Sequence, residues 1–178
     1  MTERTKTKDL IRIAVMSMII GVCAWITIPM PVPFTLQIFG VFAALKLLGA
    51  KKGTLSIVVY ILLGLVGIPV FSSFQAEPAV LLGPTGGYII GFIIMGILYI
   101  FCEPLCRNGW QKNLTLVIGL FFCYLFGTFW FSSVMAGRGR SVTFLSGLMT
   151  CVVPFIIPDL VKLAAAELVS RRVKKWIK

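Results

Sequence analysis

The sequence places a carboxylate and an ammonium three residues apart inside an apolar run. Asp159 and Lys162 lie in residues 154–162, PFIIPDLVK. On a helix, residues three apart share one face, so the two groups can pair with each other or bind a polar ligand together. A charge at the centre of a membrane helix costs about 2.5–3.5 kcal/mol on insertion scales, so the pair indicates a cavity. An internal ion pair that only fixes helix packing is the alternative.

The composition indicates a membrane protein. Of the 178 residues, 58% are hydrophobic and 13% are charged, and the mean hydropathy is +0.99. A soluble domain of this length cannot hide so much apolar surface, because its exterior needs polar cover. We therefore predict an all-α integral membrane protein in which residues 1–178 form one transmembrane domain in the lipid bilayer.

The excess of positive charge has the pattern of membrane orientation. The chain has 17 Lys and Arg against 6 Asp and Glu, a formal net charge of +11. Most of these basic residues lie between or beyond the apolar runs, as the positive-inside rule requires. A basic balance can also indicate nucleic-acid binding. No nucleic-acid partner is expected here, because membrane orientation accounts for the placement of the basic residues.

The residue types also exclude several kinds of site. The chain has no histidine, and the pair Cys102 and Cys106 has no second pair at metal-binding spacing. All five cysteines lie in or beside apolar runs, which predicts buried reduced thiols. No nucleophile–base arrangement and no phosphate-binding loop is visible. We predict no catalytic residue, no metal and no cofactor.

Six apolar runs are predicted to span the membrane, since a span needs about 20 residues to cross about 30 Å. They cover roughly residues 10–29, 36–50, 54–70, 86–103, 114–136 and 157–177. Pro158 fits the first turn of the last span, which places Asp159 where the helix dipole favours a carboxylate. Residues 141–153 then form a short helix or loop. The alternative is one long kinked helix over residues 142–170.

Three connecting features carry further candidates for the site. The alternating prolines of residues 29–33 cannot continue a helix, so this segment is extended and leads to Thr35 and Gln37. In the loop of residues 71–85 the second half is apolar and is expected to fold back over the mouth of the bundle. Gly86 and Gly87, followed by Tyr88, permit a close backbone approach. Gly87 and Gly91 have the GxxxG spacing of a packing face.

The basic residues predict the topology. With the N- and C-termini in the cytoplasm and six spans, 14 of the 17 basic residues are cytoplasmic, while Arg138 and Arg140 are outside and Lys162 is in the last span. The proline segment, the Gly86–Tyr88 segment and the Asp159–Lys162 pair then converge on the outer half. Together they can enclose a small polar solute between apolar walls.

Four blocks of the sequence resemble the BioY family, the biotin-specific S components of energy-coupling factor transporters. They are residues 34–37 (FTLQ), 64–71 (GLVGIPVF), 83–88 (GPTGGY) and 154–162. The similarity covers nearly the whole chain in order. It implies a six-helix substrate-binding subunit of the bacterial plasma membrane with substrate-capping outer loops. Such a subunit has no ATPase of its own and delivers biotin with a transmembrane T component and two ABC ATPase subunits.

The resemblance also implies roles for individual residues. Asp159 and Lys162 are expected to line the biotin site, with Asp159 accepting a ureido N–H and Lys162 neutralising Asp159 or the valerate carboxylate. Thr35 and Gln37 serve the ureido group, Tyr88 packs the rings, and Gly86 and Gly87 shape the backbone beside them. Small residues of the first span dock the T component; here this region offers Ala14, Ser17 and Gly21.

Other functions remain open at this point. An S component for another vitamin would have the same fold and topology. A stand-alone small-molecule transporter would need coupling-ion sites, for which one buried pair is thin support. A membrane enzyme would need acids in the membrane region, and only Glu77, Glu103 and Asp159 qualify.

Overall fold

The structure, a computed structural model, describes residues 3–28, 32–140 and 142–177. These ranges hold six helices of 12 residues or more: α1 (Glu3–Trp25), α2 (Gln37–Leu48), α3 (Ala50–Leu65), α5 (Gly86–Cys102), α6 (Gly109–Gly137) and α8 (Val153–Ile177). Shorter elements connect them: β1 (Thr27–Ile28), β2 (Phe34–Thr35), η1 (Ser72–Phe74), α4 (Pro78–Leu82), η2 (Glu103–Leu105) and α7 (Phe144–Cys151). The mostly helical fold agrees with the expectation from the sequence.

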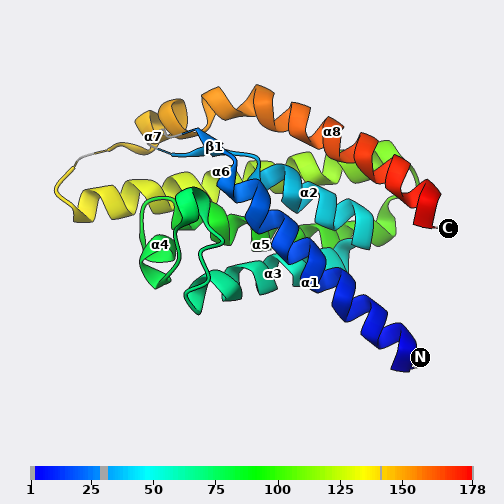
Figure 1. Cartoon of the computed structure of the whole chain (residues 1–178). Helices are drawn as coiled ribbons and strands as arrows, with labels where there is room; N and C mark the ends of the chain where they lie inside the picture. Colours follow the sequence, from blue (N-terminus) through cyan, green and yellow to red (C-terminus); the bar gives the residue numbers. More distant parts are fainter. Residues whose placement is uncertain (1–2, 29–31, 141, 178) are drawn as a thin grey trace.

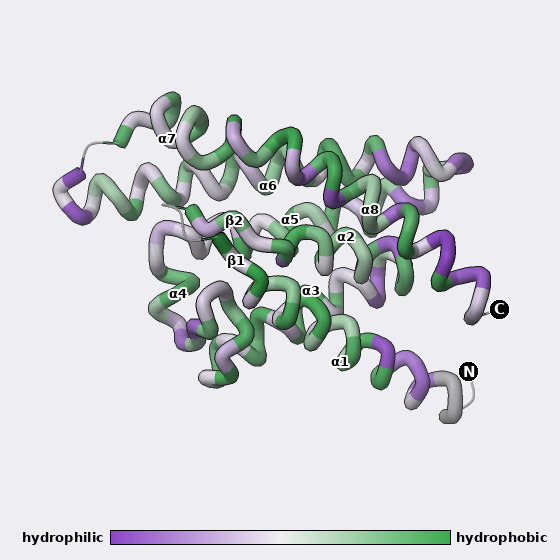
Figure 2. Tube along the Cα trace, turned by 45° about the horizontal axis from the view of Figure 1, so that its top comes forward, coloured by the Kyte–Doolittle hydropathy of each residue, from purple (hydrophilic) through white to green (hydrophobic). Residues whose placement is uncertain are grey.

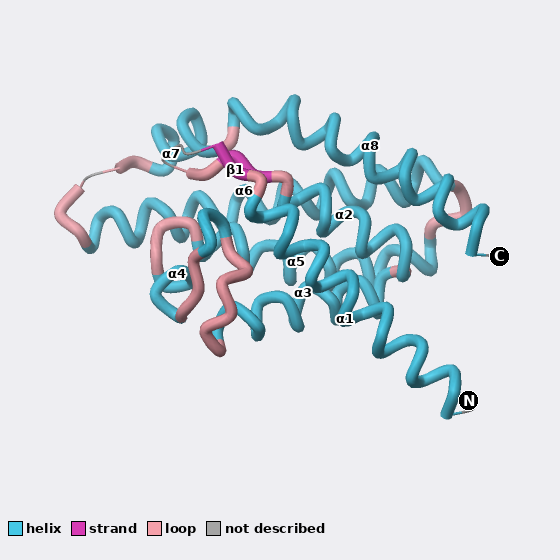
Figure 3. Tube along the Cα trace, viewed as in Figure 1, coloured by secondary structure: helices cyan, strands magenta, loops and turns pink. Residues whose placement is uncertain are grey.

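The long helices form a bundle whose two ends differ. Both chain termini lie at one end, which we call the terminal end (Figure 1). The strands, α4 and the turn between α6 and α7 gather at the other end, which we call the loop end (Figure 3). There β1 and β2 pair antiparallel, with Thr27 opposite Thr35 and Ile28 opposite Phe34. The extended structure predicted for the proline segment is confirmed at Phe34 and Thr35, while residues 29–31 lie outside the described ranges.

Helix α2 lies in the middle of the bundle. It contacts α1, α3 and α8, and Val41, Phe42 and Leu45 are fully buried. A helix that is apolar on all sides lies either in lipid or among other apolar elements, and α2 lies among other helices. Helix α5 packs along α6, and Gly91 of α5 lies against Cys123 of α6. The packing face predicted from the GxxxG spacing is therefore confirmed.

Helix length alone identifies fewer spans than the apolar runs do. Among the described residues, Gly86–Leu105 and Gly109–Gly137 are each long and apolar enough to cross a membrane, and α7 and α8 together would make a third span bent by 45°. The 12 residues of α2 extend only about 18 Å, short of the about 30 Å of hydrocarbon. Because α2 is surrounded by α1, α3 and α8, its apolar composition reflects burial among helices, and its length does not have to match the thickness of the membrane.

The turn between α2 and α3 is tighter than predicted. The predicted spans over roughly 36–50 and 54–70 leave three residues between them, but α2 ends at Leu48 and α3 begins at Ala50. Gly49 alone joins them, with φ of +80°, a conformation that glycine adopts without strain. Lys51 and Lys52 are therefore helical residues, and the predicted start of this helix at residue 54 is wrong.

The start of the last helix also differs from the prediction. Helix α8 begins at Val153, so Pro158 lies inside it and Asp159 is in its second turn. The first-turn placement of Pro158 and Asp159 is wrong; Pro154 occupies the first turn instead, where a missing N–H is tolerated. The predicted short helix before it is present as α7, and the two helices meet at an angle of 45°.

Charged groups at the terminal end tie distant helices together. The buried Lys46 of α2 donates to Asn113 of α6 and pairs with Glu167 of α8. Glu103 accepts a hydrogen bond from the N–H of Ala50 at 2.7 Å. Glu167 is thus a further acid inside the bundle, in addition to those that the sequence indicated. Its role could not be predicted, because its partner Lys46 is 121 residues away in the sequence.

Glycines keep α5 and α6 close at the loop end, and one substitution tests this. A Cβ on Gly127 would overlap the ring of Tyr88. Gly127→Ala is expected to lower the free energy of unfolding by about 1–3 kcal/mol through overpacking, measured by thermal unfolding in detergent. Gly137→Ala, in the same helix with nothing within 4 Å of its Cβ, is the matched control. Equal unfolding temperatures for the two variants would contradict this packing.

Candidate functional site

A cavity opens at the loop end between sequence-distant elements. Its polar lining comes from β2, α2, α5, α6 and α8, with the side chains of Thr35, Gln37, Tyr88, Tyr124, Asp159 and Lys162. Its apolar walls include Val32, Ile38, Phe92 and Phe155. Five of the ten residues that the sequence indicated for substrate or partner binding therefore line one cavity.

Asp159 and Lys162 form a buried ion pair in this cavity. Their side chains are 6% and 8% exposed, and the Lys162 Nζ lies 2.7 Å from the Asp159 Oδ1. The spacing of three on α8 places them on one face, as predicted. Buried charges are stable only when they are paired and hydrogen-bonded, so the remaining partners of each group matter.

Lys162 also binds the strand pair. Its Nζ donates to the carbonyl oxygen of Thr35 at 2.7 Å and lies 3.9 Å from the centroid of the Phe34 ring. The three N–H donors of the ammonium thus serve a carboxylate, a carbonyl and an aromatic face. Lys162 fastens the strand pair to α8 across 127 residues of sequence.

Helix α6 supplies polar groups that the sequence reasoning missed. Tyr124 donates its hydroxyl to the Asp159 Oδ2 at 2.5 Å. Thr128, one turn further along α6, bonds the Tyr88 hydroxyl at 3.1 Å. Both lie in a long apolar run in which a tyrosine or threonine gives no signal distinct from packing. Their spacing of four residues was the only available hint that they share a face.

Tyr124 orients the carboxylate, which predicts a defined loss when its hydroxyl is removed. Tyr124→Phe leaves the ring in place and frees one Asp159 oxygen. We expect the affinity of the site for its ligand to fall about tenfold, the lower end of the range for one hydrogen bond to a charged group. Titration calorimetry measures this. Tyr99→Phe, a buried tyrosine of α5 outside the cavity lining, should leave the affinity unchanged.

Thr35 and Gln37 connect the strand pair to α2. The Thr35 Oγ1 accepts the backbone N–H of Gln37 at 3.2 Å, and the Gln37 Nε2 donates to the Tyr60 hydroxyl at 2.9 Å. Both line the cavity as predicted. Because these bonds fix the Gln37 amide, this side chain can present one defined polar atom to a ligand.

Gly86 and Gly87 lie beside the cavity rather than in its lining. A Cβ on Gly86 would overlap the carbonyl oxygen of Leu81, and one on Gly87 would overlap the Trp130 side chain. Their lack of a side chain lets α4 and α6 approach the start of α5, where Tyr88 lines the cavity. A direct contact of either glycine with a ligand stays a prediction.

The predicted docking residues of α1 point in different directions. Ala14 is exposed, but Ser17 is fully buried and donates to the Ala14 carbonyl oxygen at 2.7 Å. Gly21 is also buried, and a Cβ there would lie 3.2 Å from the Cβ of Val70. Ser17 and Gly21 therefore pack within the bundle in this structure and do not form an exposed docking face.

The cavity combines a hydrogen-bond acceptor with apolar walls. Asp159 keeps acceptor capacity beyond its bonds to Lys162 and Tyr124, so it can receive N–H donors of a ligand. Among the described residues, no group of three His, Cys, Asp or Glu side chains is placed to hold a metal ion. The geometry suits a small, mostly apolar molecule with polar N–H groups at one end.

Comparisons with known proteins agree with this geometry. The family model of the BioY family matches residues 1–178. The chain is 38% identical over 170 residues to a protein of Thermotoga maritima named biotin transporter BioY, covering 94% of this chain and 96% of that protein. A probable biotin transporter BioY of Pyrococcus horikoshii is 41% identical over 170 residues, covering 95% and 98%. The crystal structure of the S-component for biotin from an ECF-type ABC transporter has a TM-score of 0.86 and 30% identity, over 98% of this chain and 95% of that one. The chain therefore belongs to the BioY family.

Proposed function

We propose that this chain is the biotin-binding S component of an energy-coupling factor importer in the bacterial plasma membrane. It is a multi-pass transport protein and not an enzyme. The observation that carries the proposal is the buried Asp159–Lys162 pair at the wall of a mostly apolar cavity. Its family and its similarity to proteins named as biotin transporters support biotin as the ligand.

The cavity chemistry suggests how biotin is held. The Asp159 carboxylate accepts a ureido N–H, while Tyr124 and Lys162 keep that carboxylate in place. Gln37 contributes a second polar contact, and Tyr88 and Phe92 pack the rings. Lys162 is already bound to Asp159 and Thr35, so its charge serves mainly to neutralise Asp159.

Biotin entry requires the loop end to move. The cavity measures about 80 Å³, while clefts for drug-sized ligands are typically about 300–1,000 Å³. The strand pair covers one side of the cavity and is held to α8 through Lys162. We infer that β1–β2 and the segment around α4 act as substrate-capping loops that lift to admit biotin.

The topology of the proposal has six spans in a single domain, residues 1–178, with both termini in the cytoplasm. Hydrophilic residues concentrate at the terminal end, with a second patch at the tip between α6 and α7 (Figure 2). The positive-inside rule then assigns the terminal end to the cytoplasm and the loop end to the outside. Biotin is the transported ligand, and no cofactor is required.

The partners of the proposal are a T component and two ABC ATPase subunits, because nothing in this chain resembles a nucleotide-binding site. Helix α1 offers them an exposed apolar face that includes Leu10, Ala14 and Met18. ATP hydrolysis in those partners would reorient this subunit and deliver biotin inward.

Titration calorimetry on the purified full chain tests the ligand. We expect saturable one-to-one binding of biotin with no turnover, and no binding of other vitamins. In liposomes, uptake should require the T component, both ATPase subunits and ATP. Binding of a different vitamin would make the chain an S component for that vitamin, and uptake by the chain alone would make it a stand-alone transporter.

A further inference from the structure

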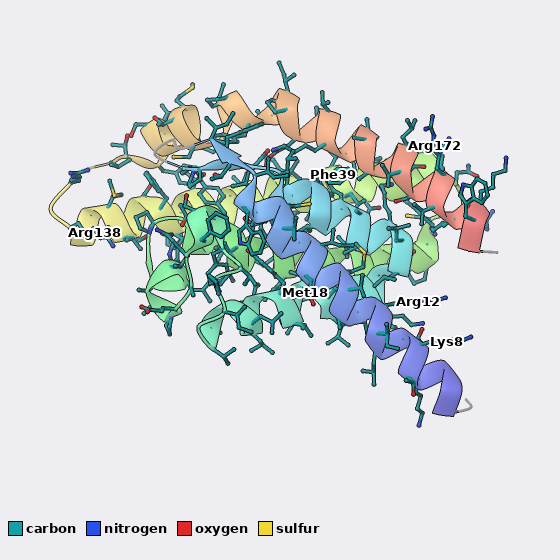
Figure 4. All side chains as sticks on the ribbon, in the orientation of Figure 1. Lys8, Arg12, Met18, Phe39, Arg138 and Arg172 are labelled. Carbon is teal, nitrogen blue, oxygen red and sulfur yellow. The ribbon has the colours of Figure 1, made fainter. Side chains whose placement is uncertain are left out.

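A second cavity lies at the loop end, beside the cavity of Asp159 and Lys162, which we call the substrate cavity. Its volume is about 460 Å³, within the range of small-molecule sites. The segment around α4, residues 75–85, supplies most of its lining, and Arg138, directly after α6, completes it. Figure 4 shows Arg138 at the tip where α6 ends. We call this second cavity the outer hollow.

The outer hollow has one charged group of each sign, Glu77 and Arg138. Both side chains are exposed, and within the described ranges neither forms an ion pair or a hydrogen bond. A carboxylate accepts N–H donors, and a guanidinium binds another carboxylate through two parallel N–H bonds. The hollow therefore offers unused groups to a small molecule that carries both N–H donors and a carboxylate.

Biotin carries both kinds of group, ureido N–H donors at one end and the valerate carboxylate at the other. Among the described residues that line the substrate cavity, Lys162 is the only cation, and its charge is paired with Asp159. The carboxylate of an arriving biotin therefore has no free cation inside. Arg138 offers one at the loop end, and the predicted topology places that end outside, where biotin arrives.

The outer hollow and the substrate cavity share one wall residue. Thr85 lines both. It precedes α5, and its carbonyl oxygen accepts the N–H of Tyr88, another lining residue of the substrate cavity, at 3.1 Å. The segment that we infer to lift for biotin entry is thus the same segment that lines the hollow. Its movement would join the two spaces at Thr85.

We propose that the outer hollow is an encounter site that binds biotin before it enters the substrate cavity; this inference rests on the proposed function. Arg138 binds the carboxylate and Glu77 accepts a ureido N–H. When the segment around α4 lifts, the ligand passes Thr85 into the substrate cavity and leaves the hollow empty. Because both charged groups are exposed to water, binding in the hollow is weak and adds no second tight site.

Rapid mixing of the purified full chain with tritiated biotin, followed by a chase with excess unlabelled biotin, tests the proposal, because the chase removes the weakly bound ligand. The rate of trapping should saturate as the biotin concentration rises, and the half-saturation concentration reports the affinity of the hollow. Arg138→Gln should raise that concentration about fivefold, which corresponds to about 1 kcal/mol, the upper end for an exposed ion pair. Arg140→Gln makes the same charge change two residues away, outside the lining, and should leave it unchanged.

The methyl ester of biotin is the matched ligand control, because it keeps the ureido ring and lacks the carboxylate charge. Its half-saturation concentration should be the same for Arg138→Gln and the original chain. The equilibrium affinity for biotin should also be equal in these two proteins, since Arg138 does not line the substrate cavity. That equality shows in addition that the variant is folded.

Three results would overturn the encounter site while leaving the proposed function intact. They are a trapping rate that rises linearly with biotin concentration, equal half-saturation concentrations in Arg138→Gln and the original chain, and equal shifts in Arg138→Gln and Arg140→Gln. A weaker equilibrium affinity of Arg138→Gln with an unchanged half-saturation concentration would also overturn it, because Arg138 would then act on the loaded state. If the original chain traps no biotin at all, the proposed function itself fails.

Discussion

Replacing Asp159 with asparagine is expected to raise the dissociation constant for biotin by about 10–150-fold. The change keeps the shape of the side chain but removes its charge. A hydrogen bond to a charged group contributes about 1.5–3 kcal/mol, and the factor follows from that range. The amide also presents an NH₂ group where the carboxylate had two acceptors for Lys162, Tyr124 and the ligand. Titration calorimetry in detergent gives the dissociation constant directly.

Glu103→Gln is the matched control for this experiment. Glu103 is also a partly buried carboxylate with a lysine partner, Lys112 at 3.3 Å, but it does not line the cavity. Its biotin affinity should stay within twofold of the original chain. An unchanged affinity in Asp159→Asn, with the protein still folded, would show that the Asp159–Lys162 pair only fixes helix packing.

Replacing Lys162 with methionine is expected to cost about 3–5 kcal/mol of folding free energy. Methionine has a similar length but leaves Asp159 buried without its counter-charge, which is the costly way to break a buried pair. The link from α8 to the Thr35 carbonyl is lost as well. The measurement is the shift of the unfolding transition in detergent, with biotin absent.

The double variant Asp159→Asn with Lys162→Met separates the two contributions. Removing the unpaired charge should restore part of the lost folding free energy, because two neutral side chains avoid the desolvation penalty of a buried ion. Lys112→Met is the control: its ion pair with Glu103 is 39% exposed at the lysine and should be worth about 1 kcal/mol or less. Equal losses in Lys162→Met and Lys112→Met would refute a buried ion pair.

Much of the site followed from local sequence signals. The Asp159–Lys162 spacing works on any helix, so their pairing did not depend on where the helix began. The alternating prolines required an extended segment, and Thr35 and Gln37 came directly after it. Asn108 and Gln111 form a capping box that starts α6 at Gly109. That signal was present in the sequence, and the predicted start at residue 114 overlooked it.

Which side of each helix is turned toward the bundle could not be predicted in the same way. Ser17 and Gly21 had the composition of a docking face, but the rotation of α1 turns them toward the bundle. A helix in lipid is apolar on every side, so its sequence carries no amphipathic pattern to show which side meets a neighbour. Close packing against α3 and its following loop sets that rotation.

Composition and short-range spacing were enough to predict the membrane class, the extended proline segment, the ionisable pair and the family resemblance, because each depends on residue content or on residues a few positions apart. Other contacts are visible only in the folded chain: Tyr124 holds Asp159, Lys162 fastens the strand pair, and Lys46 pairs with Glu167. Those contacts join residues 35, 127 and 121 positions apart. They exist only because apolar packing brings particular faces of particular helices together.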